Sequence, residues 1–106
     1  MKELSLRPYH GRLFIAKSKK DYERGHKKLF KTPDVLSCAV AGRFDAGEGK
    51  DGMWTYLIYA DKPHTLAHEL THCIFHVFER CCMDPRDSGG EAFCYMLGQL
   101  ILEAKC

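Results

Sequence analysis

The chain lacks a long uncharged apolar run, and this absence excludes a membrane-spanning helix from the expected structure. The longest such run, Ala92–Leu102, has eleven residues, whereas a helix needs about 20 apolar residues to cross a bilayer. The first eight residues, Met-Lys-Glu-Leu-Ser-Leu-Arg-Pro, also lack the apolar core of a secretory signal peptide. We therefore expect a cytoplasmic protein that has no membrane partner.

The sequence also lacks any pair of cysteines separated by two residues, which excludes a four-cysteine zinc ribbon. Six cysteines are present, but a disulfide framework is expected only in a secreted protein. In a cytoplasmic protein we expect reduced thiols. The six are Cys38, Cys73, Cys81, Cys82, Cys94 and Cys106.

A strong excess of either charge is missing as well, since 16 basic and 14 acidic residues give a formal net charge of +2. This near balance disfavours a polyanion such as nucleic acid as the partner. Basic residues are concentrated between Lys17 and Lys31, where seven lie within fifteen positions. Their spacing fits the solvated face of a helix better than a nucleic-acid patch.

Length and composition fit one α+β domain over residues 1–106. Of the 106 residues, 45% are apolar, which is enough for a single core. The sequence predicts the order strand, helix, strand, strand, helix, helix after a loose arm over residues 1–10. The predicted elements are Arg12–Lys17, Lys19–Phe30, Val35–Phe44, Met53–Ala60, a helix from Pro63 to about Cys81, and Glu91–Glu103.

Two of the predicted strands should form a hairpin. Met53–Ala60 is dominated by aromatic and β-branched residues, which favour strands. The segment before it, Asp45–Gly52, contains three glycines and is typical of a turn. We therefore expect Val35–Phe44 and Met53–Ala60 to run antiparallel.

The segment His68-Glu69-Leu70-Thr71-His72 has the spacing of a zinc-binding helix. Residues four apart on a helix differ by about 40° around its axis and by about 6 Å along it, so both imidazoles reach one ion. Glu69 is turned by about 100° from His68, which suits a base acting on water at the metal. The opposite side of this helix is apolar through Leu66, Leu70, Cys73, Ile74 and Val77.

A catalytic zinc site needs a third protein ligand and a position open to water. Glu91, nineteen residues after His72 at the start of the last helix, is the favoured ligand because a helix–loop–helix turn would fold it over the histidines. Tyr95, one turn after Glu91, is a candidate oxyanion donor, although a packed tyrosine is the commoner role. The other candidate ligands are His76, Asp84, Asp87 and Cys94.

These motifs resemble the gluzincin branch of zinc metallopeptidases. His68 to His72 followed by Gly90-Glu91-Ala92-Phe93 is most similar to compact ImmA/IrrE-type and phage-encoded metallopeptidase domains. The resemblance covers about half of the chain and implies a small zincin-like domain with a three-stranded mixed sheet, an active-site helix and a C-terminal helix. It also implies that Met53–Ala60 is an antiparallel edge strand that holds a peptide or protein substrate by main-chain pairing.

The expected function is zinc-dependent hydrolysis of peptide bonds, with one Zn²⁺ per chain and Glu69 as the base that activates water. One alternative is a zinc-binding regulatory or interaction domain without catalysis. A second is a zinc endoribonuclease of the bacterial rRNA-maturation type, which only the lysine-rich helix favours. A third is a structural domain in which the histidines are incidental.

Overall fold

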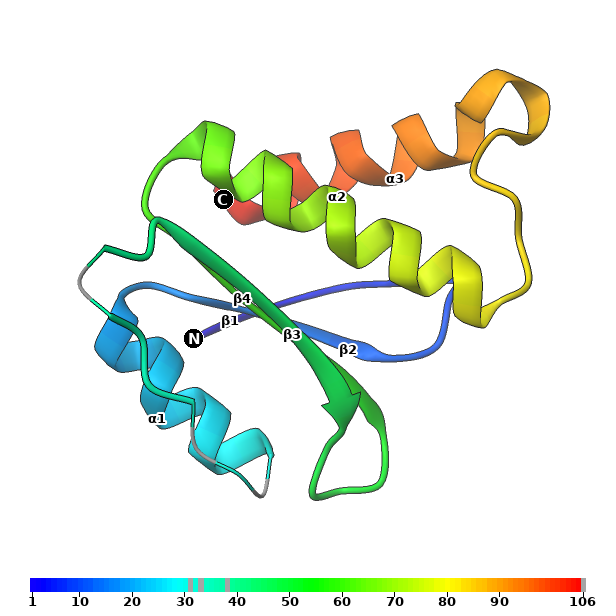
Figure 1. Ribbon diagram of the computed structural model, residues 1–106. Coiled ribbons are helices and arrows are strands. Elements are labelled where there is room, and N and C mark those ends of the chain that lie inside the picture. Colours follow the sequence, from blue (N-terminus) through cyan, green and yellow to red (C-terminus); the bar gives the residue numbers. More distant parts are fainter. Residues whose placement is uncertain (31, 33, 38, 106) are drawn as a thin grey trace.

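The sheet has four strands and carries helices on both of its faces (Figure 1). A computed structural model describes residues 1–30, 32, 34–37 and 39–105. The strand order is β1-β2-β4-β3, in which β2 and β4 are parallel and the other neighbours antiparallel. The α+β class is confirmed. The elements are β1 Lys2–Leu4, β2 Arg12–Ala16, α1 Lys19–Leu29, β3 Gly42–Glu48, β4 Trp54–Ala60, α2 Pro63–Arg80 and α3 Asp87–Lys105.

The prediction of three strands was wrong, because the expected loose arm contains β1. Leu4 is only 2% exposed, and Nζ of Lys2 donates a hydrogen bond of 2.6 Å to the carbonyl oxygen of Glu103 in α3. The N–H of Ser5 donates to a carboxylate oxygen of Glu103 at 3.0 Å. A strand of three residues shows too little alternation to be recognised in the sequence, and only contacts with distant residues stabilise it.

Strand β3 lies further along the chain than the predicted Val35–Phe44. It occupies Gly42–Glu48 and pairs with β4 from Gly42 opposite Ala60 to Glu48 opposite Trp54. The first half of the expected turn at Asp45–Gly52 is therefore strand, and the second half lies in the actual turn, which is closed by a 2.8 Å hydrogen bond from the N–H of Gly49 to the carbonyl of Met53. Pairing with β4 outweighs the weak intrinsic strand preference of the glycines. Cys38, within the predicted strand, lies outside the described residues.

Strand β4 is not an edge strand, which corrects the expectation for Met53–Ala60. Hydrogen-bonded neighbours occupy both of its sides, β2 in parallel and β3 in antiparallel orientation. Residues Thr55 to Tyr59 are all buried, as expected for a strand covered on both faces. The main-chain groups of β4 are thus already paired and unavailable to a substrate peptide. The sheet edges are β1 and β3.

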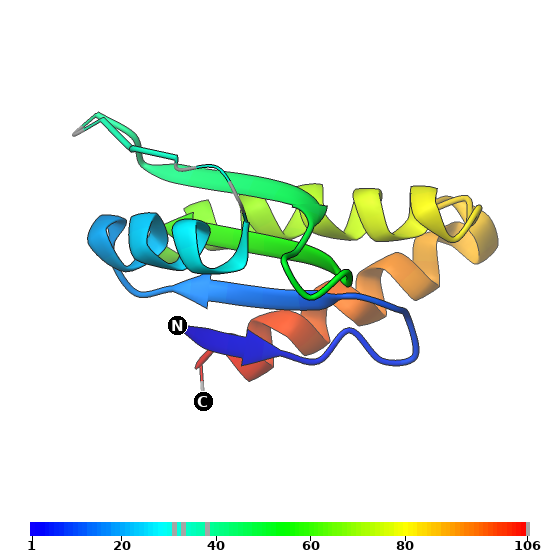
Figure 2. The same ribbon diagram turned by 90° about the horizontal axis from the view of Figure 1, so that it is seen from below.

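The sheet separates two clusters of core residues, and Figure 2 shows from below the helices that cover its two faces. Helix α1 packs on one face of the sheet with Phe14 and Leu57, and α2 and α3 cover the other face above Tyr56 and Ile58. The hydroxyl of Ser18 caps α1 by accepting a hydrogen bond from the N–H of Asp21 at 3.1 Å. Within the described residues, none of the helices combines the length and apolar character that a bilayer crossing requires.

Candidate metal centre

Helix α2 places the histidines of the HExxH segment on its solvent side. The helix begins at Pro63, whose fixed φ suits the first helical position. The predicted apolar side is confirmed, since Leu66 packs against the core and the four residues after it in the stripe are fully buried. Both His68 and His72 are exposed on the other side. The fully buried residues are Leu70, Cys73, Ile74 and Val77.

His68 and His72 converge on one point. Their Nε2 atoms lie 3.2 Å apart, and the ring planes meet at 81° with centroids 4.8 Å apart. Two nitrogens bound to one tetrahedral zinc at about 2.0–2.1 Å would be separated by about 3.3 Å. The observed separation therefore matches the separation that a shared zinc ion requires.

Glu69 lies beside this pair in the gap between α2 and the start of β3. One of its carboxylate oxygens lies within 4.8 Å of a ring nitrogen of each histidine. The residue is only 7% exposed, and no described residue donates a hydrogen bond to it. The carboxylate keeps some contact with solvent but has no protein partner, so a cation held beside it would interact with it favourably. Two imidazole nitrogens and a carboxylate oxygen are also ligands that zinc prefers, so these three residues fit a divalent metal.

Gly42, the first residue of β3, makes room for Glu69. A Cβ atom at this position would lie 3.3 Å from Oε2 of Glu69 and 2.6 Å from Cγ2 of Thr65. Atoms that close would push the strand away from the helix. Sequence analysis did not identify Gly42 as part of the site, because its role follows from the register of β3, which the sequence alone did not reveal.

Glu91 is not brought to the histidines, contrary to the expectation of a third ligand. The structure places His68, Glu69 and His72 together without it. Helix α3 turns Phe93 towards α2, with its ring 4.8 Å from that of Phe75. Because residues two apart on a helix differ by about 200°, Glu91 points away from α2.

Tyr95 is also distant from the site and does not face it. Its side chain is 72% exposed, and it lines a surface cavity of about 680 Å³ together with Glu91, Arg7 and Tyr9. It therefore lies between α3 and the N-terminal arm. Its position fits neither of the two roles expected from the sequence, an oxyanion donor or a tyrosine packed in the core.

The other candidate ligands also lie apart from the metal-ligand group. The carboxylate of Asp84 forms an ion pair with Arg86 at 3.0 Å, and Asp87 and Cys94 are exposed on α3.

Cys73 is buried below the histidines, and its burial raises the pKa of the thiol from 9.0 to about 12. It therefore remains a neutral thiol at physiological pH rather than the thiolate that binds zinc.

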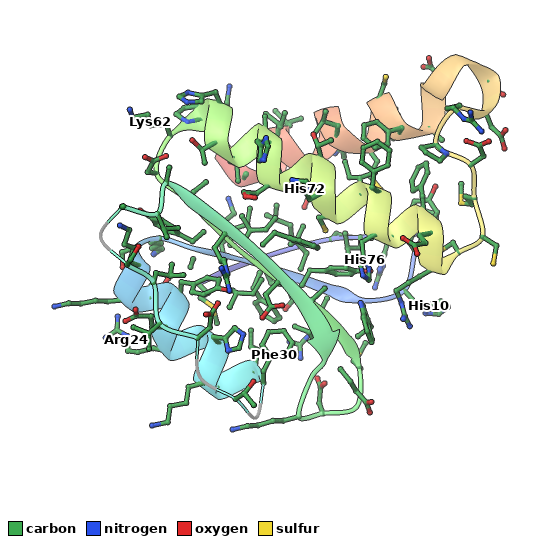
Figure 3. All side chains as sticks on the ribbon, in the orientation of Figure 1. His10, Arg24, Phe30, Lys62, His72 and His76 are labelled. Carbon is green, nitrogen blue, oxygen red and sulfur yellow. The ribbon has the colours of Figure 1, made fainter. Side chains whose placement is uncertain are left out.

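A wall of aromatic rings from β3 and β4 lies beside the site, formed by Phe44, Trp54 and Tyr56. Figure 3 shows His72 and His76 following one another along α2. The ring of Phe44 lies 6.4 Å from that of His72, and His76 stacks on Trp54 at 5.9 Å. His76 therefore belongs to the aromatic packing and is partly buried there. The sequence showed the spacing of the histidines but not the wall, which exists only after β3 and β4 pair.

A second group of possible metal ligands, His26, Asp34 and Asp45, lies on the opposite face of the sheet. In this group, the nitrogen and oxygen atoms that could bind a metal already have hydrogen-bond partners within the protein. Ring nitrogens of His26 lie 2.7 Å from the carbonyl of Thr32 and 2.6 Å from Oδ2 of Asp45. Asp34 accepts hydrogen bonds from Tyr22 and Arg43. The guanidinium beside Asp34 opposes a second cation, so this group is a structural hydrogen-bond network.

No known family model matches the sequence, and no curated protein or solved structure is similar enough to indicate a family. The geometry of the site is therefore the basis for a functional proposal.

Proposed function

We propose that this protein is a zinc-dependent hydrolase of peptide bonds, with His68 and His72 as metal ligands and Glu69 as the base. The observation that carries the proposal is the 3.2 Å separation of the two Nε2 atoms beside a carboxylate to which no described residue donates a hydrogen bond. A bound zinc ion would supply Lewis acidity and make a water molecule acidic enough to ionise near neutral pH. One zinc ion per chain is expected.

Glu69 has the position of a general base. Since no described residue donates a hydrogen bond to its carboxylate, Glu69 is available to take a proton from the attacking water and to return it to the leaving amine. The exposed faces of His68 and His72 leave the solvent side of the site open to a substrate. Because Gly42 lies so close, the carboxylate of Glu69 has little freedom to move. A fixed carboxylate stays oriented towards the water molecule from which it takes the proton.

Strand β3 lies beside this site and offers a free edge to a peptide substrate. Gly42 contacts Glu69, and Phe44 stacks against His72, so a peptide paired with the first half of β3 would pass the histidines. In the second half, Oδ1 of Asp45 already accepts a hydrogen bond from the N–H of Ala46 at 2.9 Å. We therefore expect a substrate peptide to pair with the main chain of Gly42–Phe44 and not with the internal strand β4.

A zinc-binding domain without catalysis is the second candidate. It is favoured by one observation: at this site the described residues bring together only His68, Glu69 and His72, so no third ligand remains if Glu69 acts as the base. The lysine-rich α1 packs on the sheet face opposite α2, which leaves the ribonuclease alternative without support.

Zinc content and hydrolysis test the proposal together. Elemental mass spectrometry should find about one zinc per chain in the wild type and in His64→Ala, an exposed histidine on the same helix, but little in His72→Ala. Glu69→Gln should keep zinc and lose about 100-fold or more in peptidase rate, whereas Glu79→Gln should keep both. Zinc without hydrolysis in the wild type would favour the second candidate, and absence of zinc would refute both.

A further inference from the structure

Helix α3 leaves one of its faces uncovered. Only Met96 and Leu100 of this helix are buried, although most of its sequence is apolar. Tyr95 is 72% exposed and Leu102 is 58% exposed. Large apolar side chains that gather on an exposed face mark an interaction surface more often than isolated ones do.

The exposed residues of α3 form a regular stripe, called here the α3 stripe. Regular helical geometry begins at Glu91, after three residues with left-handed φ and ψ. From there the stripe residues follow at intervals of four, three, four and three positions, which is the spacing of the seam between two packed helices. All five are exposed: Glu91, Tyr95, Gly98, Leu102 and Lys105.

Gly98, at the centre of the stripe, is not packed against any other described element of the chain. A Cβ atom built on it meets no other atom within 4 Å, so an alanine would fit. Glycine in the middle of a helix is destabilising compared with alanine. Its missing side chain does, however, let a second backbone approach the helix closely at this point.

The charges of the stripe specify the orientation of the approaching helix. Glu91 lies seven residues before Gly98, and Lys105 lies seven residues after it. If a second α3 packed antiparallel and crossed at Gly98, each Glu91 would face Lys105 of the other copy. Tyr95, three residues before Gly98, would then lie within one residue of the level of Leu102 of the other copy, four residues after Gly98. A parallel pair would instead place Glu91 beside Glu91 and Lys105 beside Lys105.

We infer that the α3 stripe is a homodimer interface, in which two copies of α3 pack antiparallel about a two-fold axis at Gly98. The contact is isologous, because the same surface of each copy meets itself. Antiparallel packing also opposes the two helix dipoles favourably. The stripe contains none of the residues His68, Glu69 and His72, so the inference is independent of the proposed function.

One helix pair makes a small interface, at the lower end of the range for specific complexes, which is roughly 1,200 Å² of total buried area. We therefore expect a reversible dimer with a dissociation constant in the micromolar range. Sedimentation equilibrium of the full chain, with a reducing agent to keep Cys94 as a thiol, would measure it. The wild type should change from monomer to dimer over roughly 1 to 200 μM.

Charge reversal provides the decisive test. Glu91→Lys and Lys105→Glu should each raise the dissociation constant about ten-fold, because each change creates two repulsive contacts per dimer. The double variant Glu91→Lys/Lys105→Glu restores both attractive contacts and should return within three-fold of the wild type. Lys27→Glu, on the exposed side of α1, is the control for net charge and should leave the dissociation constant unchanged.

Leu102→Glu extends the test to the apolar part of the stripe and should abolish the dimer while the circular dichroism spectrum stays unchanged. A monomer at 200 μM would overturn the inference. So would a dimer that is insensitive to Leu102→Glu, or a double charge variant that associates no better than the single variants. Weakening in the single variants followed by recovery in the double variant supports antiparallel pairing specifically, since a parallel pair keeps like charges together in all of these variants and its dissociation constant would not change.

Discussion

Gly42 lies so close to Glu69 that a Cβ atom on the glycine would be 3.3 Å from Oε2 of the carboxylate. The same Cβ atom would be 2.6 Å from Cγ2 of Thr65. We expect Gly42→Ala to separate β3 from α2 and to lower the free energy of unfolding by about 1–3 kcal/mol, as overpacking does. It should also weaken zinc binding, because Glu69 would shift. Urea denaturation and zinc titration measure the two effects.

Gly47→Ala is a matched control for this prediction. Gly47 is in the same strand, and a Cβ atom there would meet only the ring of Phe30, at 3.6 Å, an ordinary contact distance. Its effect on stability and on zinc affinity should be small. Equal effects of the two substitutions would show that Gly42 matters for the strand in general and not for its approach to Glu69.

His26 joins three parts of the fold through its ring nitrogens. It lies in α1, is 3% exposed, and contacts the carbonyl of Thr32 and the carboxylate of Asp45 in β3. His26→Ala removes the partner of both groups and leaves a cavity, so we expect a loss of about 2–4 kcal/mol in the free energy of unfolding. His10→Ala, at an exposed site, should change it by less than about 0.5 kcal/mol. Comparable losses would contradict the assigned role of His26.

Stability should decline at alkaline pH because of Cys73. Burial raises the pKa of its thiol from 9.0 to about 12, so the folded chain keeps this proton at pH values where the unfolded chain has lost it. The resulting stabilisation is fully present below pH 9 and is lost as the pH rises towards 12. Burial also raises the pKa of Tyr56, from 10.0 to about 12, which adds to the decline above pH 10.

Urea denaturation of wild type and Cys73→Ala at pH 7, 9 and 10.5 tests this expectation. The variant is less stable at pH 7 because it loses buried volume, but its stability should fall less between pH 9 and 10.5. Parallel declines would show that Cys73 does not contribute. In the folded wild type, Cys73 should also resist thiol reagents that modify the exposed Cys81, Cys82 and Cys94.

Arg80 covers the single tryptophan. Its guanidinium carbon lies 3.8 Å from the centroid of the Trp54 ring, a favourable cation–π distance. Arg80→Ala should cost about 0.5–1 kcal/mol of stability and shift the fluorescence maximum of Trp54 to longer wavelength, because water reaches the ring. Arg24→Ala on the exposed side of α1 is the control. An unchanged spectrum in Arg80→Ala would exclude the covering role.

The sequence alone determined the local features of the site. The convergence of His68 and His72 and the burial of the opposite side of α2 both follow from helical periodicity, which tertiary contacts do not alter. The same holds for the start of α2 at Pro63, where a fixed φ acts within one residue. The α+β class was predictable for the same reason, since strands and helices differ in the period of their apolar residues.

Only the tertiary structure decided which distant groups meet this helix. The pairing of β3 with β4 brought Gly42 and Phe44 to the site and enclosed β4, and the packing of Phe93 on α2 turned Glu91 away from it. Register and helix rotation depend on the summed contacts of whole elements. A shift of one residue changes which side chain faces the core, while the local sequence pattern stays almost the same.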